Sequence, residues 1–320
     1  MTHASVELLC LSADEIMRLV DPQRAIDALA DGFRALTRGE VQAPARPKVE
    51  TPGKGFTLAM LAAAPGQHIA TKIVSVFEGN HGLGLASHQA LVALFDADTG
   101  VPLAIMDGAS LTGLRTAAAA VLSVRELARP DARIATVVGA GVQAREHVRQ
   151  LAHARDFDEI RVFARSAKAA DAAASASAKA RCVTDLQQAI ASSDVVCLTT
   201  SSATPVIEAG WIRPGTHVTS VGYAPPGSEV PRALIENAAI YVEASSAFQA
   251  APVGCVELAG CDPASCAELG EVLLGRRPGR RSAEEITLYK SMGNAMEDMV
   301  VANLALDEAR RQRVGRTVQI

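Results

Sequence analysis

The chain has 320 residues, of which 49% are hydrophobic and 21% are charged, and its net charge is −4 at pH 7. This balance is typical of a soluble globular protein, and the length allows two domains with separate cores. Because the chain has no dense basic block and no apolar run near the ~20 residues that cross a bilayer, we expect neither a nucleic-acid partner nor a membrane partner.

Cysteine usage and the N-terminus indicate the compartment. The six cysteines contain no Cys-x-x-Cys pair, so we expect no metal site and no disulfide framework. The N-terminal residues lack the basic-then-apolar layout of a signal peptide. Both observations favour a cytoplasmic protein with reduced thiols, in which Cys197 is a small core hydrophobe.

The first third of the chain predicts two helices followed by strands. Ser12-Ala13-Asp14-Glu15 resembles a capping box, and Asp21-Pro22 begins a second helix that runs to about Thr37. From about residue 41 the pattern changes to strands, and an alanine-rich helix follows over 110–128. The predicted strands are Phe56–Ala63, Ile69–Phe77, Gln89–Asp96 and Val101–Met106.

From residue 132 onward, strands alternate with helices. Strands are expected at 133–138, 159–164, 193–200, 216–221 and 239–243. The alanine- and serine-rich run 167–180 predicts a surface helix, and a long helix is expected over 293–312. This alternation predicts an α/β fold with a Rossmann-type doubly wound parallel sheet.

The segment 133–154 carries the strongest signal. A β-branched strand leads directly into Gly-x-Gly-x-x-Ala and then into a helix. The first glycine allows a tight turn, the second lets the backbone approach phosphates, and the small third residue lets helix and strand pack closely. We therefore predict a dinucleotide site, the alternative being an ordinary tight turn. The predicted cofactor-binding residues in this segment are Gly139, Gly141, Val142, Gln143 and Ala144.

The end of the second strand of this fold predicts which dinucleotide is bound. NAD sites usually place an acid there, about twenty residues past the glycines, but this chain has Arg165 and Ser166. A guanidinium can hold a 2′-phosphate, which favours NADPH, with NADH as the second option. The alternative is a solvated surface arginine. Further cofactor contacts are expected at strand ends, at Thr199, Thr200, Val221 and Gly222.

Three basic residues on constrained backbone suggest a small carboxylate substrate. Lys72 lies within the apolar strand Ile69–Phe77, where it is either an outward, solvated side chain or a desolvated ammonium suited to proton transfer. Arg115 is expected in the first turn of a helix, where a cation opposes the helix dipole and an anion is expected beside it. Arg46 lies in the stiff segment Pro44-Ala45-Arg46-Pro47. The sequence alone does not bring the three together.

Eight segments, in order and nearly end to end, resemble the ornithine cyclodeaminase/μ-crystallin family. They are Gln42–Arg46, Ala70–Lys72, Ser87–Gln89, Met106–Gly108, Leu114–Ala118, Gly139–Ala144, Ala267–Glu271 and Lys290–Asp298. The resemblance implies a homodimer, an α+β substrate-binding and dimerisation domain over 1–128 and 293–320, and a Rossmann NAD(P)-binding domain over 129–292. It also implies that Arg46 and Arg115 bind the substrate carboxylate, that Lys72 lies beside the reacting atoms, and that Ser291 contacts the cofactor.

The loop Val221–Glu229 departs from the cyclodeaminase pattern. In ornithine cyclodeaminases the loop reads like Gly-Gly-Asp-x-Pro-Gly-Lys, and its Asp acts on the diamine substrate. Here the counterpart is Ala224, and Ser228 replaces the lysine. The glutamate that cyclodeaminases carry on the strand before Lys72 is also missing, because Phe56–Ala63 contains no acid. A methyl group cannot hold or deprotonate a distal ammonium, so we expect a reductase of a preformed cyclic imine.

Such an enzyme would reduce Δ1-pyrroline-2-carboxylate, Δ1-piperideine-2-carboxylate or both to L-proline or L-pipecolate, using NADPH. Lys72 is the candidate proton donor to the imine nitrogen. His88 and Asp107 are candidate members of a proton relay, and their alternatives are a core-bonded histidine and a turn-capping aspartate.

Other activities remain open from the sequence. An NAD(P)-dependent amino-acid dehydrogenase, such as an alanine dehydrogenase of the same family, differs by its dependence on ammonium. Ornithine cyclodeaminase follows, and then a non-catalytic protein that binds NADPH and a small ligand. The sequence predicts neither the preferred ring size nor the role of Tyr223.

Overall fold

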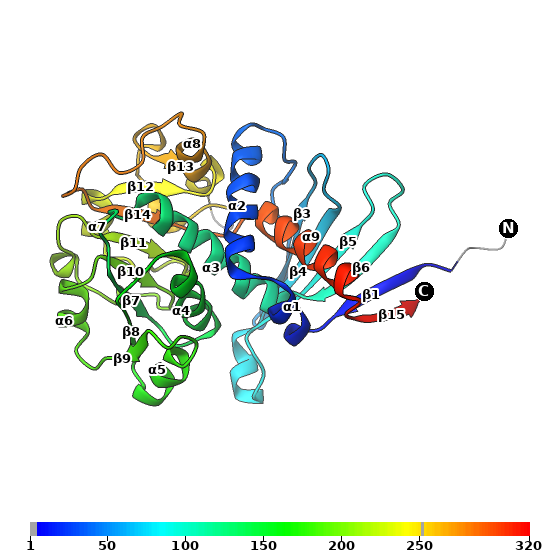
Figure 1. The fold of residues 1–320 in the computed structure, drawn as a ribbon, viewed down its shortest axis with the longest axis horizontal. Helices are drawn as coiled ribbons and strands as arrows, with labels where there is room; N and C mark the ends of the chain where they lie inside the picture. Colours follow the sequence, from blue (N-terminus) through cyan, green and yellow to red (C-terminus); the bar gives the residue numbers. More distant parts are fainter. Residues whose placement is uncertain (1–4, 251–252) are drawn as a thin grey trace. The chain divides into compact units, whose positions relative to one another are not determined.

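The computed structural model describes residues 5–250 and 253–320 and divides the chain into two compact units (Figure 1). Unit 1 runs to Arg115 and resumes over Asn294–Ile320, and unit 2 is Thr116–Gly293. Helix α3 (Gly108–Leu127) crosses the boundary between them. The division falls inside this helix, earlier than the boundary after residue 128 that we expected.

Unit 1 is built on a seven-stranded sheet in the order β15-β1-β6-β5-β4-β3-β2. Strands β2 to β6 form an antiparallel meander, β1 pairs with β6 in parallel, and β15 pairs antiparallel with β1. The strands are β1 (Glu7–Leu11), β2 (Lys48–Thr51), β3 (Gly55–Ala62), β4 (Ile69–Val76), β5 (His88–Phe95), β6 (Pro102–Asp107) and β15 (Arg316–Gln319). A 3-10 turn, η1 (Glu78–Leu83), joins β4 to β5.

Helices cover one face of this sheet. Helix α9 (Ala295–Gln312) packs along β3, β4 and β5, and α2 (Pro22–Thr37) packs on α9, as Figure 1 shows. Asn303 of α9 accepts from the backbone N–H of His68 at 2.9 Å and donates to its carbonyl at 3.1 Å. These two bonds fix the start of β4 against α9. The short helix α1 (Ala13–Leu19) begins with the capping box predicted at Ser12.

Unit 2 contains an eight-stranded parallel sheet in the order β13-β12-β14-β11-β10-β7-β8-β9. The chain enters at β7, adds β8 and β9 on one side, and then returns to add β10 and β11 on the other. The direction of winding therefore reverses between β7 and β10, the position at which open α/β sheets bind ligands. The strands are β7 (Ile134–Val138), β8 (Glu159–Phe163), β9 (Ala180–Cys182), β10 (Val195–Leu198), β11 (His217–Ser220), β12 (Ala239–Val242), β13 (Ala267–Glu268) and β14 (Thr287–Lys290).

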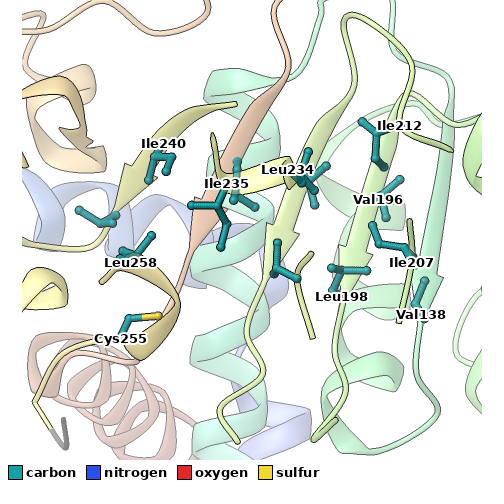
Figure 2. Close-up of a cluster of buried hydrophobic side chains, with 14 of the residues drawn as sticks. Val138, Val196, Leu198, Ile207, Ile212, Leu234, Ile235, Ile240, Cys255 and Leu258 are labelled. Carbon is teal, nitrogen blue, oxygen red and sulfur yellow. The ribbon is translucent and has the colours of Figure 1, made fainter. Parts of the chain in front are cut away.

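Helices connect these strands and bury the faces of the sheet. They are α4 (Val142–Ala154), α5 (Ala167–Ala174), α6 (Leu186–Ala191), α7 (Arg232–Asn237) and α8 (Leu269–Leu273), with 3-10 turns η2 (Ala209–Trp211), η3 (Ser245–Phe248), η4 (Val256–Leu258) and η5 (Pro263–Ser265). Figure 2 shows the cluster in which Val196 and Leu198 of β10 lie with Leu234 and Ile235 of α7 and with Leu258. These apolar contacts fix the positions of the strand ends, which the predicted cofactor residues follow.

The α/β architecture with a doubly wound parallel sheet is confirmed, but some elements differ from expectation. The helix expected over 167–180 ends at Ala174, because Ser175 is its C-cap and the chain then turns into β9. The edge strand β15, its neighbour β1 and the buried strand β14 were not predicted. Strand β14 ends in Lys290, which shortens its apolar run.

Three further observations concern the described residues. No helix among them is long and apolar enough to cross a membrane. No group of three or more His, Cys, Asp and Glu side chains within residues 5–250 and 253–320 is arranged to hold a metal ion. All six cysteines are free, and burial raises the pKa of Cys197 to about 12, so this thiol is an inert part of the core.

Candidate functional site

Lys72 lies in the middle of β4, on the sheet face that α9 covers. The register aligns it with Met60 of β3 and Val92 of β5, both of which are buried. Lys72 itself is only 2% exposed. The alternative of an outward, solvated lysine is therefore wrong, and the ammonium needs partners inside the unit.

Those partners form a buried cluster of two cations and two anions, which we call the unit 1 charge cluster: Lys72, Arg115, Glu297 and Asp298. The Nζ of Lys72 lies 2.7 Å from Oδ2 of Asp298. Arg115 donates from Nε to Oδ1 of Asp298 at 3.0 Å and from Nη1 to Oε2 of Glu297 at 2.8 Å. None of the four is more than 4% exposed. Mutual pairing offsets the cost of burying these charges.

Burial and charge set the proton affinities in the cluster. Burial, together with the nearby positive charge of Arg115, lowers the pKa of Lys72 to about 8, although Asp298 opposes this shift. Burial alone would raise the pKa of Asp298, but the charges of Arg115 and Lys72 hold it below its usual value. Asp298 is therefore ionised, and Lys72 is poised to give up a proton near neutral pH.

The two acids come from the first turn of α9. Asn294 caps this helix, and Oε1 of Glu297 accepts from the Asn294 N–H at 3.1 Å in a capping box, which leaves Oε2 for Arg115. Arg115 lies about two turns into α3, not in its first turn. The helix-dipole argument for an anion beside it was therefore wrong, because α9 supplies the anions.

Arg46 approaches the same sheet face from the edge. The carbonyl of Pro47 accepts from the Ala59 N–H at 3.1 Å, so the segment before β2 continues alongside β3. Extending this antiparallel register by one residue sets Arg46 beside Met60, the cross-strand neighbour of Lys72. Arg46 is half-buried and brings a third cation to the face that carries the unit 1 charge cluster.

The two proposed relay residues lie apart from Lys72. His88 is exposed at the start of β5 and pairs with Val76, four residues along β4 from Lys72, about 13 Å away. Asp107 pairs with Leu91 on the opposite face of the sheet, and its Oδ1 accepts from the Ser110 N–H at 2.7 Å. That geometry is a helix cap, the alternative weighed for this residue. Roles for both in proton relay stay predictions.

The glycine turn of unit 2 has the geometry that a dinucleotide needs. Gly139 has φ +134°, and a Cβ there would lie 2.4 Å from Oγ1 of Thr199, so only glycine fits. Gly141 is the N-cap of α4, with no side-chain cap, and a Cβ on it would meet no atom within 4 Å. Val142 is 64% exposed beside this space, whereas Ala144 is fully buried against the sheet. The N-terminus of α4 is thus open to an anion.

The remaining predicted cofactor residues follow the carboxyl ends of neighbouring parallel strands. Thr199 and Thr200 follow β10, Val221 and Gly222 follow β11, and Ser291 follows β14. The structure therefore brings them to the same end of the sheet as the glycine turn, the end formed by the carboxyl termini of the strands. Ser291 donates to Oε1 of Glu243 at 2.5 Å and is 1% exposed.

Arg165 and Ser166 lie just past the end of β8, on the other side of β7. Ser166 is the N-cap of α5 and accepts from the Ala169 N–H. Arg165 is exposed, and its side chain has no hydrogen-bond or ion-pair partner among the described residues. Lys168, the second residue of α5, is also exposed. The strand end therefore presents cations and no acid.

Sequence reasoning assigned no role to Glu297, Asp298 or Glu229. Acids in the first turn of a helix are expected there because they complement the helix dipole. Nothing in the sequence therefore identified them as partners of Lys72. Glu229 follows Ser228 in the loop after β11 and is 1% exposed. A buried glutamate cannot be told from an exposed loop glutamate by sequence alone, so only the fold reveals it. Ala224, where this chain departs from the cyclodeaminase pattern, lies in the same loop. The Gly227 N–H donates to the Ala224 carbonyl at 3.0 Å and closes a turn there.

Comparison with known proteins identifies the lineage. Residues 6–313 match the model of the ornithine cyclodeaminase/mu-crystallin family. The chain is 35% identical over 308 residues to ketimine reductase mu-crystallin of Rattus norvegicus, covering 93% of this chain and 96% of that protein.

Solved structures that are similar over nearly the whole chain include two at 31% identity. One is Thermococcus litoralis Delta(1)-pyrroline-2-carboxylate reductase in complex with NADH and L-proline, at 31% identity and a TM-score of 0.90, covering 97% of this chain and 100% of that one. The other is an archaeal alanine dehydrogenase dimer with bound NAD, at 31% identity and a TM-score of 0.89, covering 98% and 99%.

Proposed function

The chain belongs to the ornithine cyclodeaminase/mu-crystallin family, and we propose that within it the protein is an NADPH-dependent reductase of cyclic ketimines that carry a carboxylate. The substrates are Δ1-pyrroline-2-carboxylate, Δ1-piperideine-2-carboxylate or both, and the products are L-proline and L-pipecolate. The observation that carries this proposal is the unit 1 charge cluster, in which a buried lysine with a pKa of about 8 lies beside a carboxylate-binding arginine.

Unit 2 fits a pyridine dinucleotide. The open N-terminus of α4 suits the pyrophosphate, since Gly141 leaves the space in front of it free. Arg165 is available for a 2′-phosphate, which is why we propose NADPH although the similar structures hold NADH and NAD. When bound, the nicotinamide supplies a hydride to the substrate carbon that bears the carboxylate.

In this scheme the residues of unit 1 bind the substrate and manage its proton. Arg115 and Arg46 hold the carboxylate, which fixes the orientation of the C=N bond. Lys72 donates its proton to the imine nitrogen, so that the carbon becomes a better hydride acceptor. Asp298 holds the Lys72 ammonium in place and keeps it charged in a buried setting. The bond change is complete when one hydride has reached carbon and one proton has reached nitrogen.

Two observations support a reductase over a cyclodeaminase. Ala224 and the acid-free strand β3 offer no carboxylate for the distal ammonium of ornithine. The rat relative is named a ketimine reductase, and the Thermococcus protein is named a pyrroline-2-carboxylate reductase. The similarity to an alanine dehydrogenase favours a second candidate, the reversible amination of a 2-oxo acid.

The test follows loss of NADPH absorbance with purified protein. One reaction contains Δ1-pyrroline-2-carboxylate, a second contains pyruvate with ammonium, and a third contains L-ornithine with NAD and is assayed for proline. We expect rapid NADPH consumption in the first and none in the second, with no proline in the third. Consumption that requires ammonium would establish the dehydrogenase, and proline from ornithine would contradict the argument from Ala224.

We also propose a homodimer formed through the uncovered face of the unit 1 sheet. Ile73 of β4 pairs with Leu91 of β5 on that face, and the two are 39% and 44% exposed. Leu61 of β3 is 39% exposed. Neighbouring apolar side chains in the middle of a sheet are costly to leave in water. A second copy of the chain is the proposed occupant, and the similar archaeal alanine dehydrogenase is itself described as a dimer.

A further inference from the structure

Glu229 occupies an unusual place in unit 2. It lies in the loop after β11, is 1% exposed, and accepts four hydrogen bonds through its two oxygens. Thr200 donates its backbone N–H and its hydroxyl to Oε2, at 2.8 and 2.7 Å. Ser220 Oγ and the Gly222 N–H donate to Oε1, both at 2.8 Å. One carboxylate thus binds the loop after β10 with one oxygen and the loop after β11 with the other.

The backbone at Gly222 is held from both sides. Its N–H donates to Glu229, and its carbonyl accepts from Nζ of Lys290, the last residue of β14. A Cβ at Gly222 would lie 2.3 Å from the Thr200 carbonyl and 2.6 Å from Oε1 of Glu229. The two loops are therefore in close backbone contact, and the peptide at Gly222 has a single orientation.

Behind these loops runs a continuous buried polar chain. Ser220 Oγ, which donates to Glu229, lies 3.3 Å from Nζ of Lys290, and Lys290 forms an ion pair with Oε1 of Glu257 at 3.2 Å. Oε2 of Glu257 accepts from the Cys255 thiol at 2.6 Å. Such fully bonded networks rigidify the segments that they join.

We propose that Glu229 is a positioning residue that fixes the nicotinamide side of the cofactor site by binding the loops after β10 and β11 together. This inference rests on the proposed function, because it requires that unit 2 bind a pyridine dinucleotide. The adenosine half of the ligand is assigned to the glycine turn after β7 and to Arg165 after β8, and the four hydrogen bonds of the Glu229 carboxylate involve neither. The nicotinamide half is assigned to the strand ends on the other side of the switch point, where Glu229 acts.

Glutamine at position 229 is a nearly isosteric probe. Its side chain offers one acceptor oxygen and one NH2 group, whereas each loop presents a backbone N–H that cannot turn away: Thr200 on one oxygen and Gly222 on the other. In either orientation of the amide, its NH2 group faces one of these two backbone N–H groups. That loop then loses its hydrogen bond, and two donors face each other. Glu229→Gln should therefore loosen one wall of the site without removing side-chain volume.

The experiment compares two ligands on the full chain by calorimetric titration: NADPH, and 2′-phospho-ADP-ribose, which lacks the nicotinamide. We expect Glu229→Gln to raise the Kd of NADPH about 10-fold, because one strong hydrogen-bonding position is lost, and to change the Kd of the fragment less than about twofold. The control is Glu236→Gln, an exposed glutamate of α7 paired with Arg232, which should change neither Kd.

The outcomes separate this inference from the proposed function. Equal weakening of both ligands by Glu229→Gln would mean that Glu229 only stabilises the fold, and it would overturn the inference while leaving the cofactor assignment intact. Unchanged affinity for both would also overturn it. A wild-type protein that binds neither ligand would instead refute the proposed function.

Discussion

Arg115 has a structural role inside unit 1 that any test of its proposed substrate role must separate from binding. Its Nε and Nη1 are bound by Asp298 and Glu297, which hold the guanidinium plane in one orientation inside unit 1. Replacing it by alanine would remove the buried cation that pairs with Glu297 and would leave Asp298 with Lys72 alone, at a cost of about 3–5 kcal/mol, so a loss of binding could not be told from a loss of folding. Lysine keeps the charge and loses the planar fork, so it probes binding more cleanly.

We expect Arg115→Lys to raise the KM for the cyclic imino acid by at least about 10-fold, because a lost charge-assisted hydrogen bond costs about 1.5–3 kcal/mol. The Kd of NADPH, measured by fluorescence titration, should stay unchanged. Arg125→Lys on the same helix is the control and should change neither. An equal rise in both constants would show that Arg115 acts through the fold alone.

The proposed preference for NADPH rests on Arg165. Its guanidinium is exposed past β8, with no acid beside it. Arg165→Asp should lower the ratio of kcat/KM for NADPH to that for NADH by about 10- to 100-fold, because the 2′-phosphate loses its cation and meets an anion. Steady-state kinetics with both cofactors measure the ratio, with the exposed Lys179→Asp as the control. An unchanged ratio would remove the reason to assign NADPH.

At the scale of elements, the first turn of α9 decides how Lys72 titrates. This turn supplies both acids of the unit 1 charge cluster, and Asn303, further along α9, binds the backbone before β4. The helix thereby sets Asp298 against Lys72. Burial lowers the pKa of Lys72 to about 8, and Asp298 is the neighbour that resists the fall most strongly.

The pH profile tests this role. If protonated Lys72 is the proton donor, kcat/KM for the imine falls as the pH rises through about 8. Asp298→Asn removes the negative charge that raises the pKa of Lys72, so the alkaline limb should move to lower pH. Asp307→Asn, an exposed acid on the same helix, should leave the profile unchanged. A limb that stays in place, or moves to higher pH, would contradict the assignment.

Elements with strong local signals were predictable, and their partners were not. The strand–glycine–helix at 133–154 is visible because its residue types follow from turn geometry and phosphate access. Lys72 is visible as a charge in an apolar strand. Asp298 and Glu229 are not, because Asp298 pairs with Lys72, far away in sequence, and Glu229 binds Thr200 of a different loop. Pairings of this kind depend on sheet order and on helix placement, which local patterns do not encode.

At the scale of the molecule, the chain combines two units with different tasks in the proposed reaction. Unit 1 carries the charge cluster on one sheet face and an apolar surface on the other, and unit 2 carries the strand ends assigned to the cofactor. The apolar face predicts assembly, because Ile73 and Leu91 lie side by side and uncovered.

We expect the wild-type protein to sediment as a dimer, and Ile73→Lys to shift it toward monomer by burying a charge at the interface. Val101→Lys is the matched control, since Val101 has nearly the same exposure, 38%, but lies outside the strands. Analytical ultracentrifugation distinguishes the species. A monomeric wild type, or a dimer that Ile73→Lys leaves intact, would contradict the proposed interface.

The fate of the hydride tests the proposed imine reduction. The protein is incubated with Δ1-pyrroline-2-carboxylate and NADPH that carries deuterium at C4 of the nicotinamide, on each face in turn, and the proline is examined by mass spectrometry and NMR. We expect L-proline with one deuterium at C2 from one of the two labelled cofactors. Proline without deuterium from either cofactor, or no proline at all, would contradict it.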